Sequence, residues 1–160
     1  MSLEERLFLT GVAVHVRVFR LSGGRVGCHI GKAPVLLLTH KGRLSGKVRT
    51  NPLLYLSDGD RLVIVASYGG APQHPAWYHN LVANPSVEVQ IGKTRRPMTA
   101  RTATPEERAT YWPQVVALYR GYESYQRKTE REIPLVVLEP RSSPKRAQPV
   151  IGREAAAGRG

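Results

Sequence analysis

The chain has 160 residues, 41% of them hydrophobic, and carries a formal charge of +12 at pH 7. This length favours one domain with its own core, and no apolar run approaches the ~20 residues of a membrane-spanning helix. The single cysteine, Cys28, excludes an internal disulfide, and the N-terminus has no pattern of a secretory signal, so we expect a cytoplasmic protein.

The first predicted element is a helix that extends to about Leu21. Ser2-Leu3-Glu4-Glu5 resembles a capping box, and Gly23-Gly24 provides a stop. The alternating valines between residues 12 and 18 also fit a strand, but the capping pattern favours the helix. Its cationic side chains could contact an anionic membrane surface, although packing against the same domain is the commoner arrangement.

A basic loop between two apolar runs is the next feature. The runs, Pro34–Thr39 and Pro52–Leu56, are predicted to be strands. The loop contains several cations and two glycines: Lys41, Gly42, Arg43, Gly46, Lys47 and Arg49. Glycines can adopt positive φ and turn backbone N–H groups inward, which suits a phosphate or a carboxylate. A solvated basic hairpin is an equally good interpretation of the loop alone.

The loop does not match the Walker A pattern of nucleotide-binding proteins. That motif needs four residues between its glycines and a Ser or Thr after its Lys. Here three residues separate Gly42 from Gly46, and Val48 follows Lys47. The sequence therefore does not predict a P-loop.

Short strands and one helix follow. Asp58-Gly59-Asp60 is a turn signal that joins Pro52–Ser57 to Arg61–Ser67 as an antiparallel hairpin. Tyr68–Pro72 ends the second strand, and His74–Asn84 is predicted to be a short helix that starts near its proline. Three further strands are expected at Ser86–Ile91, at Pro97–Ala103 after a polar connection over Lys93–Arg96, and at Pro134–Glu139.

A strong helix start precedes the last strand. Thr104 can act as the N-cap, Pro105 occupies the first position, and Glu107 takes the capping-box position. The helix should run towards Tyr119, and Pro113 should kink it or divide it in two.

The composition changes after Pro140. Residues 141–160 carry scattered charge with Pro, Gly and Ala and few apolar side chains, which predicts a basic disordered tail. Residues 1–140 then form one α+β domain. Its mostly antiparallel strands should close a small barrel, with an N-terminal helix and further helices flanking it.

An aromatic set lies near the end of the second predicted helix. Its members are three residues apart, which places them near one helical face or along a loop opened by Gly121: Tyr119, Tyr122 and Tyr125. They could be core residues with hydroxyls at the surface, or an aromatic wall over a planar ligand. Trp77 and Tyr78 add to the same aromatic supply.

Charge and chemistry together narrow the classes of function. Residues 6–57 contain nine Lys or Arg and no Asp or Glu, so an anionic partner such as a cofactor, a nucleic acid or a membrane surface is expected. No metal site is predicted, because the histidines lack ligand-like spacing. No nucleophile–base arrangement can be argued either. An enzyme of this kind would most simply take its chemistry from an organic cofactor.

Five motifs between about Gly31 and Pro140 point to one family. In order they are L-L-L-T-H-K-G-R-L-S-G-K-V-R-T-N-P-L, D-G-D-R-L-V-I-V-A-S-Y-G-G-A, H-P-A-W-Y-H-N-L-V-A-N-P, T-A-R-T-A-T-P-E-E-R-A-T-Y-W-P-Q and I-P-L-V-V-L-E-P. With the tyrosine set, they resemble the deazaflavin-dependent nitroreductase family, a group of actinobacterial enzymes that use coenzyme F420. The resemblance implies a split β-barrel of the FMN-binding-protein type with the cofactor in a groove beside it.

The resemblance also implies site residues. The cofactor has an anionic phosphate and polyglutamate tail, which fits the cationic first third of the chain. Expected cofactor contacts are Arg43, Leu44 and Ser45 in a phosphate loop, Arg49, Thr50, Asn51, Pro52, Leu53 and Leu54 along the groove, Val65, Ala66, Ser67 and Tyr68 against the deazaflavin ring, and Ala76, Trp77, Tyr78, His79 and Asn80 as a cover. Arg49 is the best candidate for a charge-assisted phosphate contact. Leu44 and Tyr68 stand where the family often has a cation.

Tyrosines and one serine complete the expected site. By resemblance Tyr122 lies near both cofactor and substrate, and Tyr119 and Tyr125 belong to the substrate pocket. Ser67 and Tyr122 are the candidates for a catalytic proton donor. The expected reaction is hydride transfer from reduced F420 to a planar electrophile, such as a quinone, an activated enone or a nitroaromatic.

Two other functions fit parts of the sequence. An enzyme on the same barrel could use FMN instead of F420. A basic nucleic-acid-binding module would agree with the charge, but it needs aromatic residues among basic strand residues. The central strands are instead rich in Val and Leu, so no nucleic-acid partner is expected.

Overall fold

Antiparallel strands close into a barrel in the computed structural model, which describes residues 3–141, with side chains from residue 10 on. The strands are β1 (His29–Ile30), β2 (Ala33–Lys41), β3 (Val48–Asp58), β4 (Arg61–Val65), β5 (Ser86–Ile91), β6 (Thr94–Thr102) and β7 (Leu135–Pro140). Their order is β1-β2-β3-β4-β7-β6-β5, and a further β2–β5 pairing closes the six strands from β2 on. The predicted α+β class with a mostly antiparallel split barrel is confirmed.

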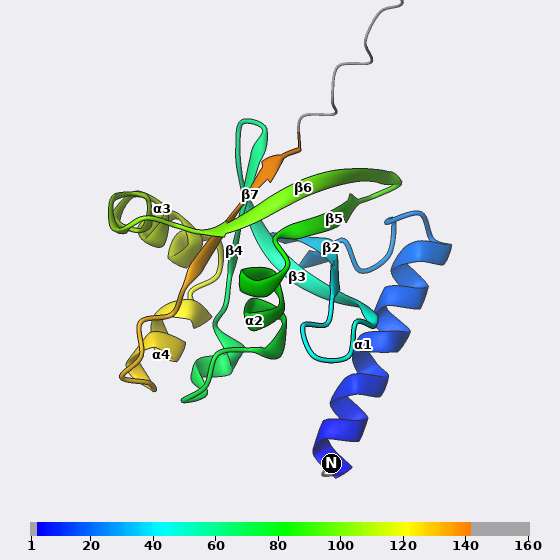
Figure 1. Ribbon diagram of the computed structural model, residues 1–160, viewed down its shortest axis with the longest axis horizontal. Coiled ribbons are helices and arrows are strands. Elements are labelled where there is room, and N and C mark those ends of the chain that lie inside the picture. Colours follow the sequence, from blue (N-terminus) through cyan, green and yellow to red (C-terminus); the bar gives the residue numbers. More distant parts are fainter. Residues whose placement is uncertain (1–2, 142–160) are drawn as a thin grey trace, which may run out of the picture.

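Helices flank the barrel. They are α1 (Leu3–Leu21), the short 3-10 helix η1 (Tyr68–Gly70), α2 (Ala76–Ala83), α3 (Pro105–Leu118) and α4 (Gly121–Arg127). Figure 1 shows α1 beside one flank of the barrel, α3 and α4 at the opposite flank, and α2 between them. The predicted tail lies outside the described residues, apart from Arg141.

Alternate residues of each strand point to opposite faces of the barrel wall, and those that point inward form an apolar cluster. On β2, Leu36 and Leu38 belong to the interior cluster, whereas Leu37 packs outward against α1. Trp77 and Leu81 of α2 join the interior cluster. Helix α2 therefore closes the barrel on the side where its own residues can also border a ligand site.

The N-terminal segment is a helix, as predicted. Val12, Val16 and Phe19 pack on one face against Leu37 of β2. Their spacing of four and three residues suits a helix and not a strand. The capping box predicted from Ser2 begins outside the described residues.

Two strands begin earlier than predicted. Strand β6 starts at Thr94, so the polar connection expected over Lys93–Arg96 is a turn of Gly92 and Lys93, with φ of +57° at Gly92. The charged residues that suggested a loop lie on an exposed strand instead, where Arg95 pairs with Glu88 at 3.5 Å. Strand β3 likewise includes the second half of the predicted basic loop.

Helix α3 is not divided at Pro113, contrary to one of the two expectations for that residue. The helix continues through Pro113 to Leu118, and the chain leaves it at Tyr119, which is extended with φ of −147°. The predicted capping box is confirmed. The Thr104 side chain accepts from the Glu107 backbone N–H, and the Glu107 carboxylate accepts from the Thr104 N–H.

The Glu107 carboxylate also joins this helix cap to the barrel. It accepts two hydrogen bonds from the Arg101 guanidinium, at 2.7 and 2.8 Å. The hydrogen bonds from Arg101 first, and then the one from Thr104 N, lower the pKa of Glu107 to about 2. Glu107 therefore stays ionised in the folded protein at pH values at which it would be protonated in the unfolded chain.

Glu107→Gln should lower the free energy of unfolding by about 1.5–3 kcal/mol near pH 7, the range for hydrogen bonds to charged groups. Because the folded pKa lies below the ordinary value of 4.5, this stabilisation is complete above that value and is lost as the pH falls towards 2. Urea unfolding near pH 7 and near pH 3 should show the difference from wild type shrinking in acid. Glu88→Gln, which removes an exposed pair, should cost little at either pH; equal losses in the two variants would contradict the prediction.

Candidate functional site

A groove of about 1010 Å³ lies between the β2–β3 loop, α2 and the segment after β4. Figure 1 shows this loop and this segment on opposite sides of α2. We call the part at residues 42–45 and Arg49 the loop end. We call the part at Val65, Ser67, Tyr68 and His74 the turn end.

Most of the expected cofactor contacts line this groove. They are Arg43, Leu44, Ser45, Arg49, Asn51, Pro52, Leu53, Val65, Ser67, Tyr68, Ala76, Trp77, His79 and Asn80. The groove is not lined by the other expected cofactor contacts, Thr50, Leu54, Ala66, Tyr78 and Tyr122, nor by Tyr119 and Tyr125. Gly42 of the predicted basic loop also lines it, as do residues that the sequence did not single out: Val12, His40, Gln73, His74 and Pro75.

The β2–β3 loop is tightly folded at the loop end. The Gly42 N–H donates to Lys47 O and the Gly46 N–H donates to Gly42 O, both at 2.8 Å. Gly46 has φ of +66°, which favours glycine. Within the described chain, the backbone N–H groups of Leu44 and Ser45 have no acceptor. The loop therefore offers two unpaired donors.

Two arginines add positive charge at the same end. The side chains of Arg43 and Arg49 line the groove, and both residues are exposed. Neither has a carboxylate partner among the side chains that the structure describes, those of residues 10–141. Uncompensated guanidinium groups beside free N–H donors suit an anionic group such as a phosphate.

A buried polar network attaches this loop to the barrel and to α2. The Arg43 N–H donates to Asn80 Oδ1 at 3.0 Å, Asn80 Nδ2 donates to His40 Nδ1 at 3.4 Å, and His40 Nε2 donates to Asn51 Oδ1 at 2.9 Å. His40 is 3% exposed and Asn80 6% exposed. Burial, the largest cause, lowers the pKa of His40, so the ring is neutral near pH 7. Its proton is assigned to Nε2 because Asn51 Oδ1 accepts there and Asn80 Nδ2 donates to Nδ1. The network fixes the loop relative to three other elements.

One arginine, which sequence reasoning missed, organises the turn end. Arg131 donates from Nε to Ala71 O at 2.8 Å, from Nη2 to Ser67 O at 2.8 Å and from Nη1 to Ala66 O at 3.3 Å. Its Nη1 also donates to His74 Nδ1 at 3.0 Å. No local pattern could predict this contact, because about 60 residues of chain separate the partners.

The three tyrosines lie together beside the turn end. Tyr119 ends α3, and Tyr122 and Tyr125 stand on α4, with ring centroids 5.2 to 6.4 Å apart. The hydroxyls of Tyr119 and Tyr125 are 3.2 Å apart. The Tyr122 ring packs in an apolar cluster with Val65, which also borders the groove.

The Tyr122 hydroxyl differs from its neighbours. Its side chain is 5% exposed, and the hydroxyl has no hydrogen-bond partner within the described part of the chain. Burial, followed by the nearby Tyr119 and Tyr125, raises the pKa of Tyr122 far above its ordinary value. The hydroxyl therefore remains protonated and able to donate.

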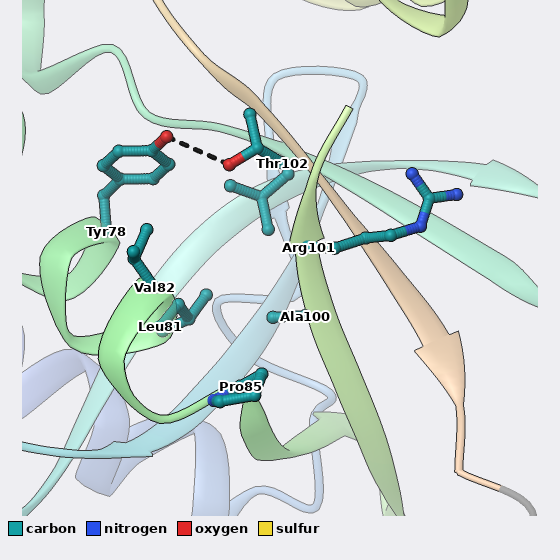
Figure 2. A pocket seen from close by; sticks show the side chains of 8 residues that line it. Tyr78, Leu81, Val82, Pro85, Ala100, Arg101 and Thr102 are labelled. Atoms are coloured by element: carbon teal, nitrogen blue, oxygen red, sulfur yellow. Dashed lines mark hydrogen bonds between the residues drawn. The ribbon is translucent and has the colours of Figure 1, made fainter. Parts of the chain in front are cut away.

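A smaller pocket of about 240 Å³ lies between α2 and β6. Tyr78 lines this pocket rather than the groove, and its hydroxyl is 3.0 Å from Thr102 Oγ1 (Figure 2). Figure 2 also shows the Arg101 side chain extending away from this pair. At about a quarter of the groove's volume, this pocket lies below the usual size of cofactor sites.

Two further features bear on the class of site. No group of three or more His, Cys, Asp or Glu is placed to hold a metal ion among the side chains that the structure describes within residues 3–141. In that same range, none of the helices combines the length and the apolar character needed to cross a membrane.

Comparisons with known proteins agree on one family. A family model described as F420H(2)-dependent quinone reductase matches residues 12–140. An F420H(2)-dependent quinone reductase of Mycobacterium tuberculosis is 41% identical over 141 residues, which cover 85% of this chain and 94% of that protein. A solved structure described as an F420-H2 dependent reductase is 43% identical with a TM-score of 0.62, covering 69% of this chain and 98% of that one. Another, described as a domain-swapped dimer, is 41% identical with a TM-score of 0.64 and covers 79% and 96%.

Proposed function

The chain belongs to the F420H(2)-dependent quinone reductase family, and we propose that it uses reduced coenzyme F420 to reduce a quinone. The observation that carries the proposal is the groove itself, which within about 1010 Å³ joins a cationic end to an end lined by uncharged and partly aromatic side chains. Such a volume lies at the upper end of the range for small-molecule and cofactor sites. An elongated cofactor with an anionic tail and a planar ring matches the two ends of this groove.

The loop end fits the anionic part of the cofactor. The N–H groups of Leu44 and Ser45 are free to donate, and Arg43 and Arg49 lack carboxylate partners in the described chain. We propose that these groups hold the phosphate, with Arg49 as the principal charged contact. The His40 network keeps the loop in this arrangement before the ligand arrives, which lowers the entropy lost on binding.

The turn end fits the planar ring and the acceptor. Trp77 and Val65 present apolar surface to the groove, and both side chains are mostly buried. They can exclude water from the reacting groups and hold the two planar molecules in contact. When bound, reduced F420 supplies a hydride. The acceptor must also gain a proton, so a donor near the turn end is required.

Two hydroxyls are candidates for that donor. Ser67 lines the groove, and its backbone carbonyl is fixed by Arg131. Tyr122 lies behind Val65 with an unpaired, protonated hydroxyl. We propose that these groups stabilise the negative charge that develops on the acceptor oxygen, Ser67 from the groove wall and Tyr122 from behind Val65.

The acceptor range is tested by anaerobic stopped-flow oxidation of reduced F420. We propose that activated enones and nitroaromatics are accepted as well as quinones, because each offers a planar electrophile that can stack at the turn end. An enzyme-dependent rate is expected with a naphthoquinone, an enone and a nitroaromatic. Loss of the rate with all three acceptors would contradict the proposed function, and loss with only the last two would restrict it to quinones.

One surface feature favours a peripheral membrane contact. Val14, Val18 and Leu21 form an exposed apolar stripe on α1, with exposures of 56%, 39% and 83%, and the exposed Arg17 lies beside it. An apolar stripe with cations suits the surface of an anionic bilayer. Sedimentation with vesicles containing about one-third anionic lipid should carry down wild-type protein, and Val18→Asp should reduce this binding. Binding to neither anionic nor zwitterionic vesicles would contradict the contact.

A further inference from the structure

The turn after β4 contains a backbone conformation that tyrosine rarely adopts. Tyr68 has φ of +46°, and within the described part of the chain no other residue except glycine has a positive φ. Gly69 and Gly70, which follow it, have φ of +64° and +81°. A bulky L-residue in this region is strained. Such strain persists only where the surroundings enforce it, and it is concentrated at functional sites.

The Arg131 guanidinium enforces this conformation. It donates to the carbonyls of Ala66 and Ser67 before Tyr68 and to that of Ala71 after it. The planar fork of an arginine fixes several acceptors in one geometry, which a lysine ammonium cannot reproduce. Arg131 has no carboxylate partner in residues 10–141, the part of the chain whose side chains are described. The hydrogen bonds of its guanidinium therefore go to this turn and to His74.

Close packing against α4 locks the turn from the other side. A Cβ atom at Gly70 would lie 2.5 Å from Tyr125 O and 3.1 Å from Lys128 Cβ, so only glycine permits this approach. The Gly70 N–H also donates to Ser67 O at 3.0 Å. The turn cannot slide along α4 without breaking these contacts.

The locked turn presents the Tyr68 ring at the turn end of the groove. The side chain borders the groove and is 54% exposed. In the described chain its ring contacts no other aromatic ring, and its hydroxyl has no hydrogen-bond partner. A strained residue whose ring is half exposed, with no aromatic or hydrogen-bonded partner among the described residues, leaves a ring face available to a ligand.

We propose that Tyr68 is the shelf on which the electron acceptor stacks, and that Arg131 is the positioning residue that holds this shelf in place. The inference rests on the proposed function and specifies the acceptor side of the same groove. The cationic loop end takes the anionic cofactor tail, so the acceptor must enter at the turn end, where the lining side chains are uncharged. A stacking shelf favours acceptors with a larger fused planar surface over single-ring acceptors, because the contact grows with ring area. Tyr68 therefore sets acceptor specificity.

The test compares a naphthoquinone with a benzoquinone in four variants. Tyr68→Phe keeps the ring, Tyr68→Asn removes it with a residue that tolerates positive φ, and Arg131→Lys removes the fork. Arg127→Lys is the matched control, because Arg127 is exposed and pairs only with Glu123 at 3.6 Å. The readouts are the ratio of kcat/KM for the two quinones, the Kd of the naphthoquinone for protein loaded with oxidised F420, the Kd of F420, and the melting temperature.

Tyr68→Phe and Arg127→Lys should keep the kcat/KM ratio within about twofold of wild type. Tyr68→Asn should lower the ratio and weaken naphthoquinone binding by roughly tenfold, the order expected for one lost aromatic stacking contact, with little change in the Kd of F420. Its melting temperature should not fall, because the strain is relieved. Arg131→Lys should lower the ratio to a similar extent.

Distinct results would overturn each part of the proposal. A weaker Kd for F420 with an unchanged ratio in Tyr68→Asn would place Tyr68 against the cofactor and not the acceptor. A lower melting temperature with a wild-type ratio in Arg131→Lys would make Arg131 merely structural. Wild-type protein that neither binds F420 nor reduces either quinone would refute the proposed function, and the shelf with it.

Discussion

Replacing Tyr122 by phenylalanine should slow quinone reduction by roughly ten- to a thousandfold, the range for loss of a general acid or a charge-stabilising donor. The substitution keeps the ring, which packs with Val65 and Val63 in the cluster behind the groove wall. Only the hydroxyl is removed, and that hydroxyl has no hydrogen-bond partner within the described part of the chain. Stability and F420 affinity should therefore change little.

The pH dependence of turnover should follow from the burial of the Tyr122 side chain. The pKa of Tyr122 is raised by burial, so the folded protein keeps the phenol neutral well above pH 10. The neutral phenol is the donating form. Turnover of wild-type protein should consequently show no loss from tyrosine ionisation between pH 6 and pH 10.

Single-turnover oxidation of reduced F420 by a naphthoquinone is the measurement for this prediction. Tyr55→Phe is the control, because burial also raises the pKa of Tyr55 but this residue does not line the groove. The control should match wild type. If Tyr122→Phe also matches wild type with every acceptor, the hydroxyl has no catalytic role, and Ser67→Ala should then show the loss instead.

Arg49→Ala should weaken F420 binding by roughly 10- to 150-fold, which corresponds to about 1.5–3 kcal/mol for a hydrogen bond to a charged group. Arg49 borders the loop end, is exposed, and lacks a carboxylate partner among the described side chains of residues 10–141. Because its guanidinium forms no ion pair with a described carboxylate, the melting temperature should barely change. Added salt should reduce the difference between wild type and variant.

Fluorescence titration with oxidised F420, together with thermal melting, measures both quantities. Arg25→Ala is the control, since Arg25 is an exposed arginine of the same acid-free region that does not line the groove. Its affinity should fall by less than about twofold. A large drop in melting temperature with retained affinity would make Arg49 a structural residue. Equal losses of F420 affinity in both variants would show that the loss comes from the lower positive charge of the region and not from a contact made by Arg49.

Local patterns were sufficient to predict most elements. The capping box at Thr104 and the turn at Asp58-Gly59-Asp60 depend on residues close in sequence, and both are found in the structure. The capping pattern at the N-terminus favours a helix over a strand, and the packing through Val16 and Phe19 confirms the helix. The ends of strands were harder to predict. The exposed charged residues near Arg95 and Val48 are typical of loops, and only their pairing with a neighbouring strand places them in β6 and β3.

The motifs predicted which segments line the groove. They did not predict which side chains of a helix face the groove, because that depends on the geometry of the helix. Trp77 and Tyr78 were expected to share a role, but neighbours on a helix point about 100° apart. Trp77 therefore borders the groove, whereas Tyr78 faces the smaller pocket by β6. Contacts between distant segments had no sequence signal at all. The hydrogen bonds of Arg131 to the turn and of His40 to Asn80 exist only once the barrel has closed.

The central claim is that the groove is built for F420. The most direct measurement is a parallel titration of purified protein with oxidised F420, with FMN and with a random oligonucleotide, at low and at high salt. F420 should bind at least tenfold more tightly than FMN, because only F420 has an extended anionic tail for the loop end, and salt should weaken that binding. The oligonucleotide should not compete. FMN binding as tight as F420 binding, or tighter, would contradict the account.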